Sequence, residues 1–345
     1  MLIAPESTAK RVKKAFKYQF VAIASILLFS SFSSIRGQAK SVAKSNSQEQ
    51  TCKVVAKVLS GDINWAPGSK LCQEDKVHPV NGHKVEVLCY LSAKILQLTS
   101  STMGEHCSPR SQRQNQNCTL RDGRTCIKPK GPGEDENAPT LITPYGLVIL
   151  NMSPTLSWSA TPLATSYIVQ IEGKGVSWSV EVVEKTQLPY PKEQPAMQPG
   201  NVYNVNIIAN KADEPIAASA SVVLIASTDK MQQIVSIINR LQSLNQSQDE
   251  LTIDIDRVYE AQNLVNESIN LLKARTEGGT KNPTIYRLLG DRYLEAYLAS
   301  AAISAYSTAT KLAQKENNAE ELAKAEAGAK IAEQSQKRGE GVRGS

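Results

Sequence analysis

Six cysteines are the residues whose type and spacing offer the most chemistry in this sequence. They lie in one segment, at Cys52, Cys72, Cys89, Cys107, Cys118 and Cys126. Three histidines share the segment, and four residues separate His78 from His83, a spacing that paired zinc ligands use. No Cys-x-x-Cys pair accompanies them, however, and Pro79 and Gly82 predict a turn there. An even, clustered set of cysteines in an exported chain is typical of disulfides. We therefore expect the six cysteines to form disulfides, in a pairing that the sequence does not define, with zinc binding as the alternative.

The common catalytic motifs are absent from the sequence. It has no Gly-x-Ser-x-Gly, no His-Glu-x-x-His and no phosphate-binding Gly-x-x-x-x-Gly-Lys-Ser/Thr. Asp254 and Asp256 are close in sequence, but residues two apart on a helix point to different faces, so we expect a solvated surface rather than an acid–base pair. We expect Trp65 to be buried beneath a loop rather than to stack on a sugar. The sequence therefore predicts a protein that is not an enzyme, without catalytic residues, metal ligands or a cofactor.

The positive charge of the chain is concentrated at its N-terminus. The 345 residues include 39 Lys and Arg against 33 Asp and Glu, for a net charge of +6. Six of the basic residues but only one acidic residue precede Lys40, so the rest of the chain is nearly neutral. This balance argues against the basic surface that nucleic-acid binding requires.

Residues 1–39 have the layout of a secretory signal peptide. A basic stretch at 10–17 precedes an apolar run at 20–32 whose only polar residue is serine. Gly37 and Ala39 then place small residues at the −3 and −1 positions of a cleavage site. The apolar run is shorter than the roughly 20 residues that a membrane-spanning helix needs. We therefore expect export to the periplasm or cell envelope, with an uncleaved signal anchor as the alternative.

Residues 52–126 are predicted to form a small disulfide-rich β domain. The run at 84–90 alternates, with Val85, Val87 and Cys89 on one face and the neighbouring residues on the other. Because the apolar core is thin, disulfides are expected to close the domain. The segment resembles the FecR-like β domains of bacterial envelope proteins in the order of its turns. These are a Gly-Asp turn, a Pro-Gly-Ser turn, a charged corner at Glu74–Lys76 and a Val-rich hairpin.

Three polar segments are expected to lie outside the folded domains, because they cannot bury enough apolar surface. They are a flexible lead-in at 40–51, a linker at 127–140 and a disordered tail at 334–345.

Residues 141–226 are predicted to form a β-sandwich. Six strand-like segments recur about every ten residues between turns rich in Pro, Gly and Asn, at 147–150, 155–159, 166–171, 177–183, 202–209 and 217–225. The sequences Pro154–Trp158, Ala164–Ile171 and Gln198–Ile207 resemble the second, third and sixth strands of a fibronectin type III domain. The resemblance implies that Trp158 and Tyr167 are core residues and that Tyr203 forms a tyrosine corner, in which its hydroxyl caps nearby backbone.

From residue 228 to residue 333 the apolar period changes from 2 to 3.6, which predicts α-helices. Thr228 or Asp229 is expected to cap the first helix, and Ser247 or Asp249 to open the second. Seven residues fall on the tetratricopeptide pattern counted from Pro283: Tyr286, Leu289, Gly290, Tyr293, Ala302, Tyr306 and Ala309. Thirty-four residues earlier the same register gives Ile255, Asp256, Tyr259, Ser268, Leu272 and Arg275. The segment therefore resembles tetratricopeptide repeats with a capping helix at 318–333; an unrelated helical hairpin is the alternative.

The order of these segments resembles that of multidomain bacterial envelope proteins, particularly those of cyanobacteria. We therefore expect an exported interaction scaffold that binds a protein or peptide on its helical repeats and β surfaces. The alternative is that the domain at residues 52–126 binds a small ligand, glycan or metal, and that the other domains only present this domain. Neither nucleic acid nor a small-molecule substrate is expected as a partner.

The predicted signal peptide leads to a test of processing. Mass spectrometry of the exported protein is expected to find its N-terminus at Lys40 or within a few residues of it, because the small residues at −3 and −1 define the cleavage site. An intact Met1 in the membrane fraction would favour the signal anchor instead.

Overall fold

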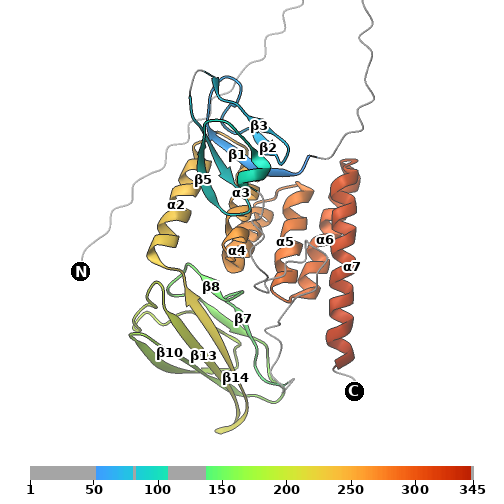
Figure 1. Ribbon diagram of the computed structural model, residues 1–345. Helices are drawn as coiled ribbons and strands as arrows, with labels where there is room; N and C mark the ends of the chain where they lie inside the picture. Colours follow the sequence, from blue (N-terminus) through green and yellow to red (C-terminus); the bar gives the residue numbers. More distant parts are fainter. Residues whose placement is uncertain (1–51, 81–82, 108–136, 343–345) are drawn as a thin grey trace, which may run out of the picture. The chain divides into compact units, whose positions relative to one another are not determined.

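The structure, a computed structural model, describes residues 52–80, 83–107 and 137–342. The predicted signal peptide, the lead-in at 40–51, most of the linker, Cys118 and Cys126 lie outside these residues. Within the described part, the chain has the three expected kinds of region in the expected order: a β region with two disulfides, a β-sandwich and a series of helices (Figure 1). None of the helices in these ranges is both long enough and apolar enough to cross a membrane.

The first β region is built on a four-stranded antiparallel sheet. Its order is β2-β1-β4-β5, with β1 at Val54–Ser60, β2 at Lys70–Cys72, β4 at Val85–Cys89 and β5 at Lys94–Leu98. The short strands β3 (Lys76–Val77) and β6 (Ser101–Thr102) pair with each other, and α1 (Met103–Cys107) follows.

Two disulfides, Cys52–Cys72 and Cys89–Cys107, tie the β region together. The first links the start of β1 to β2, and the second links β4 to α1. The disulfide prediction is confirmed for these four cysteines. Such bonds indicate an oxidising, exported environment.

The sheet of this region is buried on both faces, which the alternating pattern did not predict. Val85, Val87 and Cys89 face one core as expected, but Leu88 is also fully buried. Leu88 packs with Leu59 and Tyr90 against apolar side chains of two helices, among them Ile237 and Val258. The opposite face of the sheet is therefore covered by helices rather than by solvent.

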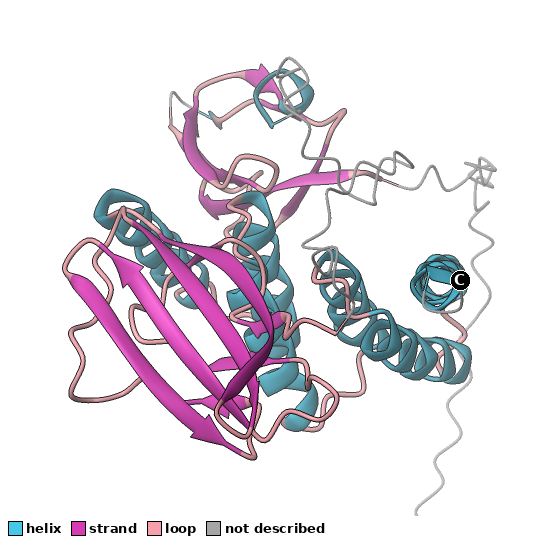
Figure 2. Ribbon diagram, turned by 90° about the horizontal axis from the view of Figure 1, so that it is seen from below, coloured by secondary structure: helices cyan, strands magenta, loops and turns pink. Residues whose placement is uncertain are grey.

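The β-sandwich consists of a three-stranded and a five-stranded sheet (Figure 2). The first has the order β12-β9-β7, with β7 at Leu141–Thr143, β9 at Leu156–Trp158 and β12 at Gln187–Leu188. The second has the order β11-β10-β13-β14-β8, with β8 at Val148–Ile149, β10 at Ser166–Gly173, β11 at Val176–Val183, β13 at Val202–Lys211 and β14 at Glu214–Ile225. Each of the six strand-like segments coincides with or overlaps one of these strands.

Aromatic side chains form the centre of the sandwich. The rings of Trp158 and Tyr167 meet edge to face, with centroids 5.4 Å apart, and both side chains are buried. The Tyr203 hydroxyl accepts a hydrogen bond from the Gln198 backbone N–H at 2.7 Å and donates one to the Lys174 carbonyl at 3.1 Å. Tyr203 therefore has the backbone-capping contacts expected of a tyrosine corner.

Six helices follow the sandwich. They are α2 (Thr228–Gln242), α3 (Gln248–Ala261), α4 (Val265–Glu277), α5 (Pro283–Glu295), α6 (Ala299–Lys315) and α7 (Ala319–Val342). The first helix is capped by Ser227 rather than by Thr228 or Asp229, and α3 by Ser247, because each serine side chain accepts a backbone N–H of the first turn. The last helix continues to Val342, past the expected end at residue 333. Residues 334–342 contain Gln, Lys and Glu, which favour a helix.

One turn geometry recurs at the 34-residue interval. Between α3 and α4, Asn263 has a φ of 56° and Leu264 has φ −95° and ψ 62°. Between α5 and α6, Tyr297 has a φ of 61° and Leu298 has φ −99° and ψ 65°. The two helix pairs α3–α4 and α5–α6 are therefore joined in the same way.

The residues predicted to pack the repeat are not all at one contact. Leu289 packs with Ile285 and Leu288, whereas Ala302 and Tyr306 share a second cluster with Leu294 and Ala332. Gly290 faces Tyr306, because a Cβ at Gly290 would lie 2.7 Å from the Tyr306 ring. A Cβ at Gly328 on α7 would lie 2.5 Å from the same ring. Glycines on α5 and α7 thus make room for one tyrosine of α6.

A pair of leucine substitutions tests the packing of α6. Ala302 is fully buried, so Ala302→Leu is expected to cost about 1–3 kcal/mol of the free energy of unfolding by overpacking. Ser300 is exposed on the same helix, and Ser300→Leu is expected to cost little. Thermal melts of the mature chain followed by circular dichroism compare the two. Equal losses, or a larger loss at Ser300, would contradict the helical register.

Candidate functional site

Helix α3 carries two buried carboxylates that point to opposite sides. Asp254 and Asp256 are both fully buried, so the expectation of a solvated surface is wrong. The two residues do face different directions, as their spacing required. Each side of α3 is covered by another part of the chain that supplies a cation, and this is why neither carboxylate reaches solvent.

Asp254 joins α3 to the disulfide-bonded β region. The Lys57 Nζ on β1 donates to Asp254 at 2.6 Å and to Glu250 at 2.9 Å, and Lys57 is itself fully buried. The Tyr90 hydroxyl donates to the other Asp254 oxygen at 2.6 Å, and the Arg257 guanidinium lies 4.4 Å from the Tyr90 ring centroid. Burial, followed by the Asp254 charge, raises the pKa of Tyr90 well above its usual value, so this phenol stays protonated.

Asp256 joins α3 to α5 through Arg292. The guanidinium donates to both Asp256 oxygens at 2.9 Å, which is a bidentate ion pair. The same guanidinium pairs with Glu260 at 3.0 Å and with Glu295 at 2.7 Å. Burial by itself would lower the pKa of Arg292, but the Asp256, Glu295 and Glu260 carboxylates raise it well above its usual value. A permanently charged side chain is thus held among three carboxylates.

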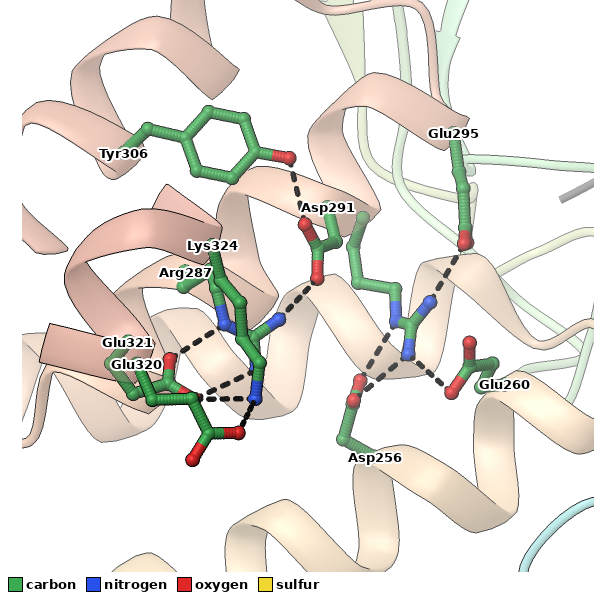
Figure 3. Close-up of polar contacts among 10 residues, drawn as sticks. Asp256, Glu260, Arg287, Asp291, Glu295, Tyr306, Glu320, Glu321 and Lys324 are labelled. Atoms are coloured by element: carbon green, nitrogen blue, oxygen red, sulfur yellow. Dashed lines mark hydrogen bonds and ion pairs between the residues drawn. The ribbon is translucent and has the colours of Figure 1, made fainter. Parts of the chain in front are cut away.

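A second ion network links α5 to α7 (Figure 3). Arg287 on α5 pairs with Asp291 at 2.6 Å and with Glu321 of α7 at 2.6 Å. Asp291 also accepts a hydrogen bond from the Tyr306 hydroxyl at 2.7 Å. Lys324 on α7 pairs with Glu320 at 2.6 Å and with Glu321 at 3.6 Å.

These two networks border one cavity of about 330 Å³. Its wall is contributed by α3, α5, α6 and α7. The polar part of the wall comprises Glu260, Arg287, Asp291, Arg292, Glu295, Tyr306 and Lys324. The apolar part comprises Leu294, Ala327, Gly328 and Ile331. A concave site with mixed apolar and charged walls is suited to binding a side chain or a short peptide segment.

Glu295 has a perturbed carboxyl in the cavity wall. Burial is the main reason that its pKa rises to about 7, and Arg292 opposes this shift. The negative charges of Glu260, Asp256 and Asp291 raise the pKa further. At neutral pH this carboxyl is therefore divided between its protonated and charged forms.

The remaining residues that the sequence singled out lie elsewhere. Tyr286 donates a hydrogen bond from its hydroxyl to the Thr280 carbonyl at 3.2 Å, Tyr293 packs beside both helical clusters, and Ala309 is fully buried. Trp65 packs partly buried against the core of the first β region. Of the predicted repeat residues, the cavity wall includes only Tyr306.

In the described part of the first β region, the histidines are not grouped with other potential metal ligands. His78 Nδ1 lies 2.8 Å from the Ser100 hydroxyl. Among the residues that the structure describes, no group of three or more His, Cys, Asp or Glu side chains is placed to hold a metal ion.

Sequence reasoning missed the charged residues of the cavity. One signal concerned Asp256, the partner of Arg292, which stands 34 residues before Gly290 and so occupies the equivalent position of the predicted repeat. A second signal was spacing, since Arg287 and Asp291 are four residues apart and Arg292 and Glu295 three, as in pairs on one helix face.

Comparisons with known proteins give one limited similarity. No family model matches the chain, and no curated protein matches it. Among solved structures, the chain is similar to the fibronectin type III domain of the human collagen alpha-1(XX) chain. The sequence identity is 19%, the match covers 26% of this chain and 83% of that chain, and the TM-score is 0.21.

Substituting Arg292 tests the role of the buried ion network. Arg292→Met leaves Asp256 buried without its cation and is expected to cost about 3–5 kcal/mol of unfolding free energy. Lys324→Met removes a half-exposed ion pair and is expected to cost about 1 kcal/mol or less. Denaturant unfolding of the mature chain measures both. Similar losses of unfolding free energy would show that the Arg292 network stabilises the fold no more than the half-exposed Lys324 ion pair does.

Proposed function

We propose that this protein is an exported, non-enzymatic scaffold that binds a segment of another protein in the cavity bordered by α3, α5, α6 and α7. The observation that carries the proposal is the cavity itself, which combines an apolar wall with fixed charged groups. Peptide-binding sites use this combination, because apolar contacts supply affinity and fixed polar groups supply orientation.

The helical arrangement supports this reading. The turn repeated after 34 residues favours the interpretation of α3–α4 and α5–α6 as tetratricopeptide-like repeats, with α7 as their cap. Stacked helix pairs form a concave surface that binds extended segments. Most of the cavity wall comes from α5 and α7, and α3 adds Glu260.

The setting of the proposed scaffold is the bacterial cell envelope. The two disulfides support an oxidising compartment, and the layout of residues 1–39 supports export by a signal peptide. The order of the three regions supports a multidomain envelope protein of the cyanobacterial type, with a FecR-like first β region and a fibronectin type III-like sandwich.

A cavity-filling substitution tests the proposal on the mature chain. The wild type is expected to retain a reproducible set of peptides from a random displayed library. Ala327 is exposed in the cavity wall, so Ala327→Trp is expected to fill the cavity and to abolish this retention without lowering the melting temperature.

The matched control is Ala323→Trp, at an exposed alanine one turn earlier on α7 that is not part of the cavity wall. It is expected to retain the same peptides as the wild type. A wild-type protein that selects no peptides, or an Ala327→Trp variant that keeps them all, would overturn the proposal.

A further inference from the structure

The cations that line the cavity are all shared among carboxylates. Arg292 pairs with Asp256, Glu260 and Glu295, Arg287 with Asp291 and Glu321, and Lys324 with Glu320 and Glu321 (Figure 3). Three cations thus share six carboxylates. An incoming anion would meet cations that are already paired, whereas an incoming cation would approach two ion networks in which carboxylates outnumber cations.

Glu295 is a carboxylate of the Arg292 network that also belongs to the cavity wall. Its carboxylate accepts one hydrogen bond from Arg292, a donor that also serves Asp256 and Glu260. The side chain is 22% exposed and belongs to the cavity wall. A buried carboxylate is stabilised by a fully matched cation, and here one guanidinium is divided among three acids.

The wall beside Glu295 is apolar. Leu294 and Ile331 line the cavity from α5 and α7, together with Ala327 and Gly328. Lysine and arginine side chains combine a methylene stem, which packs on apolar surface, with a charged end. A volume of about 330 Å³ is at the small end of ligand sites and is of the order that one such side chain and its flanking backbone require.

We propose that the segment bound in this cavity inserts a lysine or arginine side chain, whose charged end pairs with Glu295 and whose stem packs on Leu294 and Ile331. This inference rests on the proposed function, because it specifies the chemistry of the segment that the cavity takes. The neighbouring group of carboxylates excludes an acidic side chain at the same position.

The proposal makes binding depend on pH through Glu295. Four charged groups of the described chain act on its pKa: Asp256 and Glu260 from α3, and Asp291 and Arg292 from α5. The cavity wall also includes Arg287 from α5, Lys324 from α7 and the Tyr306 hydroxyl from α6. A protonated Glu295 offers no charge to a basic side chain, so protons compete with the ligand. Since the pKa of Glu295 is about 7, affinity is expected to rise with pH and to level off above pH 8.

The test uses a histidine-free peptide selected by the wild-type mature chain. Replacing its central Lys or Arg by Gln is expected to weaken binding about tenfold or more, as for loss of a charge-assisted contact. Titration calorimetry with the original peptide is expected to give about tenfold weaker binding at pH 6 than at pH 8, because a carboxyl with a pKa near 7 is mostly protonated at pH 6.

Two variants separate this site from a general charge effect. Glu295→Gln keeps an oxygen for Arg292 but is expected to bind more weakly at pH 8 and to lose the dependence on pH. Glu326→Gln removes an exposed carboxylate of α7 outside the cavity wall and is expected to behave as wild type. Selected peptides that bind in the cavity without a basic residue, or an unchanged pH profile in Glu295→Gln, would overturn the inference while leaving the proposed function standing.

Discussion

The structure depends on one helix whose two opposite sides each bury a carboxylate. Asp254 of α3 pairs with Lys57 of the disulfide-bonded sheet, and Asp256 of the same helix pairs with Arg292 of α5. A buried charge without its partner is strongly destabilising, so each pair fixes what must lie on that side of α3. The sheet and the later helices are thereby held against the same short element.

These ion pairs fix where the sheet and α5 lie against α3, whereas the burial of apolar side chains provides most of the stability. Around Lys57, the residues Leu59, Leu88 and Tyr90 pack on Ile237 and Val258, and this contact buries the second face of the sheet. On the other side, Tyr306 fits against Gly290 and Gly328 and brings α5, α6 and α7 together. The charged groups then have their geometry set by packing, which is what a preorganised binding site requires.

The cavity is a consequence of this arrangement. Because Arg292 must satisfy Asp256 inside the helical layer, its remaining donor groups are directed to Glu260 and Glu295 at the cavity wall. The carboxyl of Glu295 at this wall has its pKa raised to about 7, mainly by burial. The structural ion pair and the proposed specificity for a basic side chain thus share one guanidinium.

The sequence by itself determined the local elements, because strand alternation, helical periodicity, capping serines and clustered cysteines are properties of neighbouring residues. It placed six strands of the sandwich, the change from strands to helices near residue 228, Trp158 and Tyr203 as core residues, and a predicted 34-residue register that includes Gly290 and Tyr306. Only the tertiary structure decided that Leu88 and Lys57 are buried, that Asp254 and Asp256 have cations on both sides of α3, and that a cavity forms beside Glu295. Burial of a charged residue depends on a partner distant in sequence, here 197 residues away for Lys57 and Asp254, and no local pattern records that pairing.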